Sequence, residues 1–234
     1  MKQVLGIVGG MGPLATVELF RLLVETTKSE NDAGHIRILI DNNTGIPDRT
    51  SSIIGNGASP VPYIVESAKG LRSLGANYIL IPCNTSHYYY DQIQREIDIP
   101  VINMVEETAK EISEKKYKKV GILATTGTIA GQVYDRYLCE RNIELIKPSE
   151  SQQIAVMDYI YNGVKAGNKA YDVKRFVNTI DDLYKRGAET IILACTEINV
   201  GLSMYNIKTA SIIEPMKVLA KKAVLRAGYD VVGD

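Results

Sequence analysis

The chain alternates short apolar runs with longer segments of helical periodicity. The apolar runs are rich in Val, Ile and Leu and end at Gly, Pro or Asn, which is typical of buried parallel strands. Strands that alternate with helices predict an α/β fold with mainly parallel sheets. Eight strands are expected, four in each half of the chain, at residues 3–9, 36–41, 77–82, 100–103, 119–124, 142–147, 189–194 and 210–213.

The helix after the first strand is predicted to be largely buried. Pro13 suits its opening turn, and its polar stripe is narrow. The stripe consists of Glu18, Arg21 and Glu25, and the apolar positions around it are Val17, Leu19, Phe20, Leu22 and Leu23.

Residues 42–60 form a connection rich in Asn, Gly, Ser and Pro that is longer than most loops in a compact domain. Loops of this length tend to be functional or mobile. At the other end of the chain, a closing helix is expected over residues 215–226.

Two stretches end in cysteine after nearly the same run-up, Gly75 to Cys83 and Gly187 to Cys195, at one offset (195 − 83 = 187 − 75 = 112). The glycine-containing segment at residues 4–12 also resembles residues 120–127. Two matches in the same order favour an internal duplication. They predict a first lobe of residues 1–103 plus 214–234 and a second lobe of residues 104–213.

Composition narrows the class of protein. With 234 residues, 45% of them hydrophobic and 23% charged, the chain is expected to be a soluble globular protein. Lys plus Arg balances Asp plus Glu at 27 each, which argues against nucleic-acid and membrane partners. Because the sequence shows neither a signal peptide nor a membrane span and has few cysteines, a cytoplasmic location is expected.

Cys83 and Cys195 carry the main chemical hypothesis. Both follow strands at the edge where parallel sheets bind ligands, and both precede residues that open helices. A helix N-terminus lowers the pKa of a thiol, so both cysteines are expected to titrate near neutral pH. Two thiols that face each other across one cleft can move a proton from one side of a carbon to the other. The alternative is a pair of inert buried cysteines, which is the interpretation preferred for the unmatched Cys139.

Other chemistries have weaker signals. Neither cysteine has a second Cys or His at metal-ligand spacing, so no metal is expected, and His87 is predicted to have a surface or interface role. A working disulfide would lack the Cys-x-x-Cys motif. Tyr88, Tyr89 and Tyr90 are expected to serve packing or an oligomer surface.

A dinucleotide-binding motif is the main alternative. Gly10-Met-Gly12-Pro-Leu-Ala15 matches G-x-G-x-x-A after a strand, with Asp41 as a possible ribose partner, and predicts a Rossmann-type oxidoreductase that binds NAD. Against it, Asp41 comes later than the usual ~20 residues and Pro13 removes an amide donor. The same glycines would equally let the backbone approach a small carboxylate.

Charged and hydroxyl side chains suit a dicarboxylate. Arg49 binds carboxylates as a planar fork, and Lys165 binds them as a point charge. The segment from Thr125 to Thr128 offers hydroxyls and amides to an anion, or simply an N-cap.

Six segments together resemble the cofactor-independent aspartate racemases of the aspartate/glutamate racemase superfamily, almost end to end. They are residues 9–16, 46–50, 82–87, 123–128, 163–167 and 195–197. The resemblance implies two α/β lobes related by a pseudo-twofold, an active site in the inter-lobe cleft, no pyridoxal phosphate or other cofactor, and a homodimer. With the strand pattern above, each lobe is expected to have a four-stranded sheet.

The resemblance also assigns roles. Cys83 and Cys195 would be the acid/base thiols, with Asp48 and Glu197 as assistants. The substrate-binding positions are Met11, Arg49, Asn84, Thr85, Thr128 and Lys165, to which we add Thr126 and Thr196 as donors to the α-carboxylate.

The predicted activity is interconversion of L- and D-aspartate by two-base proton transfer. Glutamate racemases carry an Asp-Ser-Gly opening and a His after the second Cys-Thr, where this chain has Gly-Gly-Met-Gly and Glu197, which favours aspartate. Glutamate or maleate as the substrate of a two-cysteine racemase or isomerase, and an amino-acid sensor without catalysis, stay open as alternatives.

Overall fold

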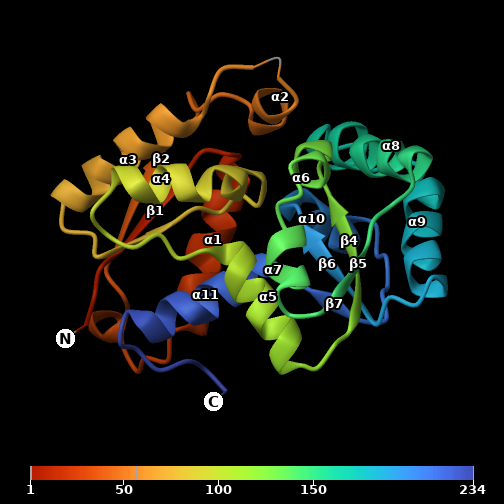
Figure 1. Cartoon of the computed structure of the whole chain (residues 1–234). Coiled ribbons are helices and arrows are strands. Elements are labelled where there is room, and N and C mark those ends of the chain that lie inside the picture. Colours follow the sequence, from red (N-terminus) through yellow and green to blue (C-terminus); the bar gives the residue numbers. More distant parts are fainter. Residues whose placement is uncertain (1, 56, 234) are drawn as a thin grey trace. The chain divides into compact units, whose positions relative to one another are not determined.

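The chain divides into two compact α/β units, which a computed structural model describes over residues 2–55 and 57–233 (Figure 1). The first unit comprises Met1–Glu107 and Met216–Asp234, and the second comprises Thr108–Pro215. Each unit has one parallel sheet with helices packed on it, so the α/β class expected from the alternating pattern is confirmed.

The first unit contains both ends of the chain. Its elements are β1 (Leu5–Gly9), α1 (Pro13–Thr26), η1 (Asp32–Gly34), β2 (Ile38–Asn42), α2 (Arg49–Ile53), α3 (Val61–Ser73), β3 (Tyr78–Leu80), η2 (Thr85–Tyr89), α4 (Tyr90–Glu96) and α11 (Pro215–Arg226). Helix α5 (Met104–Glu114) begins in this unit and runs into the second.

The second unit is the middle of the chain. Its elements are β4 (Lys119–Ala124), α6 (Thr126–Ala130), α7 (Asp135–Cys139), β5 (Glu144–Ile146), α8 (Glu150–Asp158), the π-helix η3 (Tyr159–Lys165), α9 (Lys174–Lys185), β6 (Thr190–Ala194), α10 (Thr196–Met204) and β7 (Ile212–Ile213).

The two sheets share a strand order. The first is β2-β1-β3 and the second is β5-β4-β6-β7, with every pair parallel. Val101 forms an isolated parallel bridge with Ile79 of β3. This bridge occupies the position in the first sheet that β7, the neighbour of β6, has in the second. The strand predicted at residues 100–103 is therefore reduced to this bridge, and the first sheet has three strands rather than four. The reason is space, because α5 begins at Met104, two residues after Ile102 makes its last bond to Ile79.

A three-residue contact is built twice and supports the internal duplication. A Cβ on Gly6 would lie 3.1 Å from Ile79 and 3.3 Å from Leu71. A Cβ on Gly121 would lie 3.2 Å from Ile191 and 3.3 Å from Leu183. The Ile and Leu residues in the two sets are related by the same offset as the cysteines. In each unit a glycine in an inner strand lets the helix before the next strand pack directly on the sheet.

The glycine turns predicted before the cysteine-bearing segments are also present twice. Gly75 and Gly187 have φ values of 102° and 95°, in the left-handed region that glycine adopts freely. The residue after each glycine donates its amide to a carbonyl five residues back, Ala76 to Leu71 and Ala188 to Leu183, both at 3.0 Å. This is the helix ending that turns the chain into β3 and β6.

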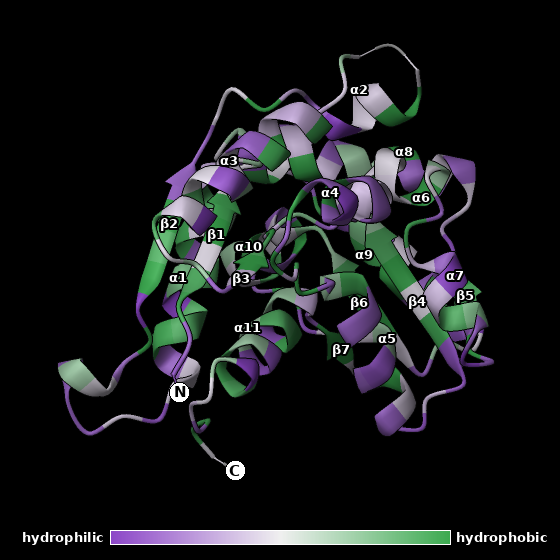
Figure 2. Cartoon of the chain, turned by 60° about the vertical axis from the view of Figure 1, so that its left-hand side comes forward, coloured by the Kyte–Doolittle hydropathy of each residue, from purple (hydrophilic) through white to green (hydrophobic). Residues whose placement is uncertain are grey.

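Hydrophobic side chains fill the space between each sheet and its helices, and Figure 2 shows β1 and β4 mostly green. In the first unit, α1 and α11 pack on the same side of the core through Leu19, Leu23, Leu219 and Val224. The prediction that α1 is largely buried is wrong. Val17 is 62% exposed and Phe20 is 43% exposed, because only one face of α1 contacts the sheet and α11.

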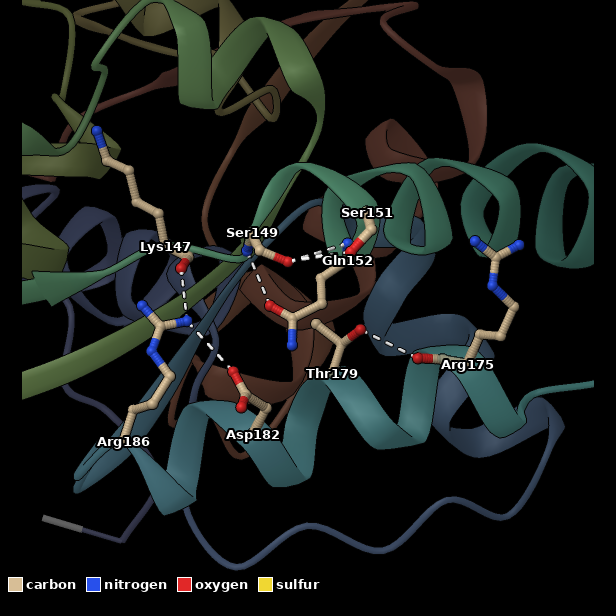
Figure 3. A network of polar contacts seen from close by, with 8 residues as sticks. All are labelled: Lys147, Ser149, Ser151, Gln152, Arg175, Thr179, Asp182 and Arg186. Carbon is tan, nitrogen blue, oxygen red and sulfur yellow. Dashed lines mark hydrogen bonds and ion pairs between the residues drawn. The ribbon is translucent and has the colours of Figure 1, made fainter.

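Helix α8 is held at its start by a polar network shared with α9 (Figure 3). Ser149 and Gln152 form a capping box, with Ser149 N 2.8 Å from Gln152 Oε1. Gln152 also bonds Asp182, and Arg186 donates to Asp182 and to the Lys147 carbonyl. These contacts fix the beginning of the helix that contains Met157. Among the described residues, no helix has the length and apolar character that a membrane crossing needs.

Candidate active site

The residues predicted for the site fall into two groups, one in each unit. The first half-site consists of Met11, Asp48, Arg49, Cys83, Asn84 and Thr85. The second half-site consists of Thr126, Thr128, Lys165, Cys195, Thr196 and Glu197.

Cys83 lies at the end of the segment that follows β3. It is a free, buried cysteine at the edge of the cluster that includes Met11 and Ile46. Its amide donates to the Ile81 carbonyl at 2.8 Å, which turns the chain out of the sheet. Asn84 and Thr85 follow directly and are also buried, so the thiol and two polar side chains share one short segment.

Arg49 ties the loop after β2 to the loop after β1. Its Nη1 donates to the carbonyls of Ile46 and Pro47 at 3.3 and 3.0 Å, and its Nη2 donates to the Met11 carbonyl at 3.2 Å. Its Nε is buried and has no hydrogen-bond partner among the described residues. The guanidinium is thus partly occupied by main chain, with the Nε–H left over.

The predicted long loop contains a short helix that is anchored beside Cys83. Asp48 is the N-cap of α2, and its Oδ1 accepts from the amide and the hydroxyl of Ser51 at 2.7 and 2.9 Å. Tyr89, from the helix after Cys83, donates to Ser52 Oγ at 2.7 Å. The structure therefore brings α2 to the cysteine segment through Tyr89, which was expected to serve packing or an oligomer surface, and Ser52, which no pattern in the sequence indicated.

His87 does not lie on the surface as predicted. It is buried, and both ring nitrogens have backbone partners: Nδ1 lies 2.9 Å from the Cys83 carbonyl and Nε2 lies 3.1 Å from the Met104 amide. Burial lowers the pKa of His87 to about 4, against the opposing effect of nearby carbonyls of Cys83 and Ile102. The imidazole is neutral at physiological pH.

Cys195, Glu197 and Lys165 form a connected set in the second half-site. The Cys195 thiol donates to Glu197 Oε2 at 3.0 Å. The other carboxylate oxygen of Glu197 lies 3.5 Å from Lys165 Nζ, which also lies 4.7 Å from the centre of the Tyr161 ring. One carboxylate therefore joins a thiol to an ammonium group.

The pKa of Cys195 is raised, which overturns the prediction of a thiol that titrates near neutral pH. Burial is the largest cause, followed by the charge of Glu197 and the hydrogen bond to it. The Glu197 amide and Lys165 favour the thiolate but do not outweigh these effects. Burial also opposes the charge of Lys165, but Glu197, Tyr161 and Cys195 together raise its pKa. At rest Cys195 is a thiol and Lys165 is an ammonium.

A π-helix positions Lys165. The amides of Ala166 and Asn168 donate to carbonyls five residues back, those of Tyr161 and Gly163. Helix α10, which carries Glu197, packs against this π-helix at Gly201, where a Cβ would lie 2.6 Å from both Tyr159 Cζ and Val164 Cγ2. The absence of a side chain at Gly201 allows the close contact of the two helices that bear Lys165 and Glu197.

Thr126 and Thr128 lie at the start of α6, after β4. Thr125 is the N-cap, and its Oγ1 lies 3.3 Å from Thr128 N and 3.1 Å from Thr128 Oγ1. The Thr126 amide donates to the Met157 sulfur at 3.2 Å, a contact that nothing in the sequence indicated. Beside them lies an open cavity of about 660 Å³, whose lining includes Thr126, Met157 and Tyr161.

In the segment that matches the dinucleotide-binding motif, Gly10 allows a close contact with another loop of the protein. Gly10 has a φ of 90°, and a Cβ there would lie 2.8 Å from the backbone nitrogen of Thr44. The loop after β2 thus packs on the very glycine that a pyrophosphate would need to approach. Within the described residues, no group of three or more His, Cys, Asp or Glu side chains is placed to hold a metal ion.

Comparison with known proteins identifies the family. Residues 8–223 match the family described as Asp/Glu/hydantoin racemase. The chain belongs to the Asp/Glu/hydantoin racemase family. Its activity class is therefore that of an amino-acid racemase, and the dinucleotide-binding oxidoreductase is not favoured.

Individual members of the Asp/Glu/hydantoin racemase family align along most of the chain. The broad specificity amino-acid racemase RacX of Bacillus subtilis is 28% identical over 224 residues, which cover 94% of this chain and 96% of that protein. The structure of Picrophilus torridus aspartate racemase has a TM-score of 0.84 and 30% identity, covering 98% of this chain and 96% of that one. Glutamate racemase from Francisella tularensis shares the fold, with a TM-score of 0.69 at 17% identity, covering 100% of this chain and 84% of that one.

Proposed function

We propose that this chain interconverts L- and D-aspartate, with Cys83 and Cys195 as the two acid/base groups and without a cofactor. The observation that carries the proposal is the equivalence of the thiols. Both are free and buried, and each follows the corresponding strand of a sheet with the same strand order. Inversion at a carbon needs one group to remove a proton and a second to supply one.

In the proposed reaction, the thiolate of one cysteine takes the α-proton as the Cα–H bond breaks. The thiol of the other cysteine gives its proton to the opposite face of the carbon. The number of protons is unchanged, and the two sulfurs have exchanged roles. Because Cys195 rests as a thiol hydrogen-bonded to Glu197, Glu197 accepts the thiol proton when Cys195 is to act as the base. After the transfer Glu197 releases this proton to solvent and Cys83 regains one, so the enzyme returns to its starting state.

The side-chain carboxylate of aspartate is assigned to Arg49 and Lys165. Arg49 uses three N–H contacts on main-chain carbonyls, and its unpartnered Nε–H shares an edge with Nη2. That edge is the one through which Arg binds a carboxylate with two parallel bonds. Lys165 is already paired with a carboxylate, that of Glu197, at a distance that leaves room for a second partner.

The α-carboxylate is assigned to the amides and hydroxyls of Asn84, Thr85, Thr126, Thr128 and Thr196. Negative charge grows on this carboxylate as the α-proton leaves, and one donor that meets such charge is worth ~3 kcal/mol. The present partner of the Thr126 amide is a thioether, which is a weak acceptor. Its replacement by a carboxylate oxygen is therefore favourable.

The test follows L-aspartate in heavy water by optical rotation and α-deuteration. Wild type is expected to racemise aspartate and to deuterate both enantiomers. Cys83→Ala and Cys195→Ala are each expected to lower racemisation by about 10²- to 10⁴-fold. Cys139→Ala, which changes the exposed cysteine at the end of α7, serves as the control and should behave as wild type. Racemisation that survives in either of the first two variants contradicts the two-thiol scheme.

A broader amino-acid specificity is the second candidate, because the Bacillus subtilis relative is a broad specificity racemase. A deuterium-exchange panel of L- and D-amino acids separates the two. Exchange confined to aspartate supports the first candidate, exchange of glutamate or of apolar amino acids supports the second, and binding without exchange would indicate a sensor.

A further inference from the structure

His87 is a buried side chain that the proposed reaction does not use. His87 lies in the middle of the short helix after Cys83, four residues beyond the cysteine. Its ring makes two hydrogen bonds to backbone groups, one with the cysteine itself and one with the first residue of α5. A ring with both nitrogens bonded has one orientation.

The partners also decide where the proton of the ring lies. The Met104 amide is a donor, so Nε2 accepts and carries no hydrogen. The single proton of the neutral ring is then on Nδ1, which donates to the Cys83 carbonyl at 2.9 Å. Burial keeps the ring in this neutral form. Tyr90 stacks parallel to it with ring centres 6.5 Å apart.

The segment that His87 holds lies beyond the end of a strand. Strand β3 ends at Leu80, so the residues up to Cys83 lie outside the sheet ladder. The bonds on either side are local: Cys83 N to Ile81 O, and His87 N to Asn84 O at 3.0 Å. The Cys83 carbonyl thus accepts a hydrogen bond from His87 Nδ1, where a strand residue would accept one from the neighbouring strand.

The other ring contact anchors this segment to a long element. Asn103 Oδ1 accepts from the amides of Val105 and Glu106, both at 3.1 Å, and His87 accepts from the amide of Met104. His87 therefore completes the capping of α5 at its first residue. Through the ring, the Cys83 carbonyl is fixed to the beginning of an 11-residue helix.

We propose that His87 is a positioning residue that sets the place of the Cys83 thiol through the cysteine's own carbonyl, without contact with substrate. The proposal rests on the proposed function, in which Cys83 is an acid/base group. The second half-site is built differently, since Asn199 stands four residues after Cys195 and the Cys195 carbonyl accepts from the Ile198 amide at 3.1 Å. The imidazole contact belongs to one thiol only.

The test compares three substitutions. The amide of Asn in His87→Asn lies where Nδ1 lies and can donate to the Cys83 carbonyl, whereas that of Gln in His87→Gln lies near Nε2 and reaches only the Met104 amide. His87→Phe keeps a ring and loses both bonds. Tyr90→Phe, which keeps the ring that stacks on His87 and removes the 3.4 Å bond to the Val101 carbonyl, is the control and should keep wild-type kinetics. A thermal midpoint for each variant reports folding.

Two readouts are needed. The first is kcat and KM for racemisation, because a displacement of about 1 Å in an acting group lowers the rate by up to 10²-fold. His87→Phe and His87→Gln are expected to lose about 10- to 100-fold in kcat with little change in KM, and His87→Asn to recover most of it. The second is the alkylation rate of each cysteine by mass spectrometry. The ratio of the Cys83 alkylation rate to the Cys195 alkylation rate is expected to change in His87→Phe and His87→Gln. The alkylation rate of the exposed Cys139 is the reference.

The proposal is overturned if the Asn, Gln and Phe variants have unchanged thermal midpoints and equal kcat values. It is also overturned if the alkylation rates of Cys83 and Cys195 change by the same factor. If His87→Phe fails to fold, the comparison of Asn with Gln decides. If wild type racemises no aspartate, the proposed function fails, while the alkylation ratio still tests whether His87 positions Cys83.

Discussion

Cys83 and Cys195 follow equivalent strands of two sheets that share their strand order, yet their surroundings differ. Cys83 is held through its carbonyl by a neutral imidazole. Cys195 is bonded through its sulfur to a carboxylate that also pairs with Lys165. Duplication has kept the frame of the two half-sites, whereas the groups that hold and ionise each thiol have diverged. On the two proposals above, the Cys83 thiol is controlled by its position and the Cys195 thiol by the charge beside it.

The largest expected effect separates these two kinds of control. Glu197→Gln keeps the size of the side chain but removes the acceptor for the Cys195 proton, so racemisation should fall by about 10²- to 10⁴-fold. Because the charge and hydrogen bond of Glu197 raise the pKa of Cys195, the same variant should lower that pKa and speed alkylation of Cys195. Alkylation of Cys83 should not change.

The control for this prediction is Glu144→Gln, which alters an exposed carboxylate of the same unit that pairs with Lys119. It should leave racemisation and both alkylation rates as in wild type. Slower alkylation of Cys195 in Glu197→Gln would show that Glu197 does not hold the thiol in its protonated form.

The second prediction concerns the first half-site and pH. His87 binds a proton at about 4 when folded and at 6.5 when unfolded, so between these values the unfolded state carries more protons. Stability is therefore complete above pH 6.5 and falls as pH drops toward 4, by about 3 kcal/mol over 2.5 units. Urea unfolding at a series of pH values measures this, with His87→Asn as the comparison. If the difference in unfolding free energy between wild type and His87→Asn stays constant between pH 7 and 4, the prediction is wrong.

The smallest expected effect compares two glycines. In Gly201→Ala, the new Cβ meets Tyr159 and Val164 where α10 packs on the π-helix, which should cost about 1–3 kcal/mol of unfolding free energy. Gly70→Ala in α3 meets nothing within 4 Å and should stabilise by about 0.5–1 kcal/mol. Denaturant unfolding of both variants measures the contrast. Equal effects would show that the contact at Gly201 is not tight.

Much of the frame was visible in the amino-acid sequence because it depends on local patterns. The run of β-branched and small residues at 119–124 is β4, and the helix opened by Pro215 ends at Arg226 as predicted. The glycine turns at Gly75 and Gly187 follow from the need for a positive φ. Helix α1 was misjudged because apolar residues around a helix do not reveal which side meets a neighbour.

The fine structure of the half-sites was less accessible. The raised pKa of Cys195 depends on its burial and on the direction of the Glu197 side chain, neither of which is written in a Cys-Thr-Glu motif. His87 finds its second partner 17 positions away, at Met104. Met157 reaches Thr126 across 31 positions. Such contacts arise only once strands and helices are packed.

The π-helix before Lys165 has a consequence for how this half-site can evolve. A π-helix turn holds one residue more than an α-helical turn, as if one residue had been inserted into an ordinary helix. Loss of a single residue within it would restore an ordinary helix and rotate the Lys165 side chain by about 100° around the axis. The ammonium would then leave Glu197 although no residue of the site had been substituted. Chain length in this one turn is thus as much a determinant of the ion pair as the identity of its two members.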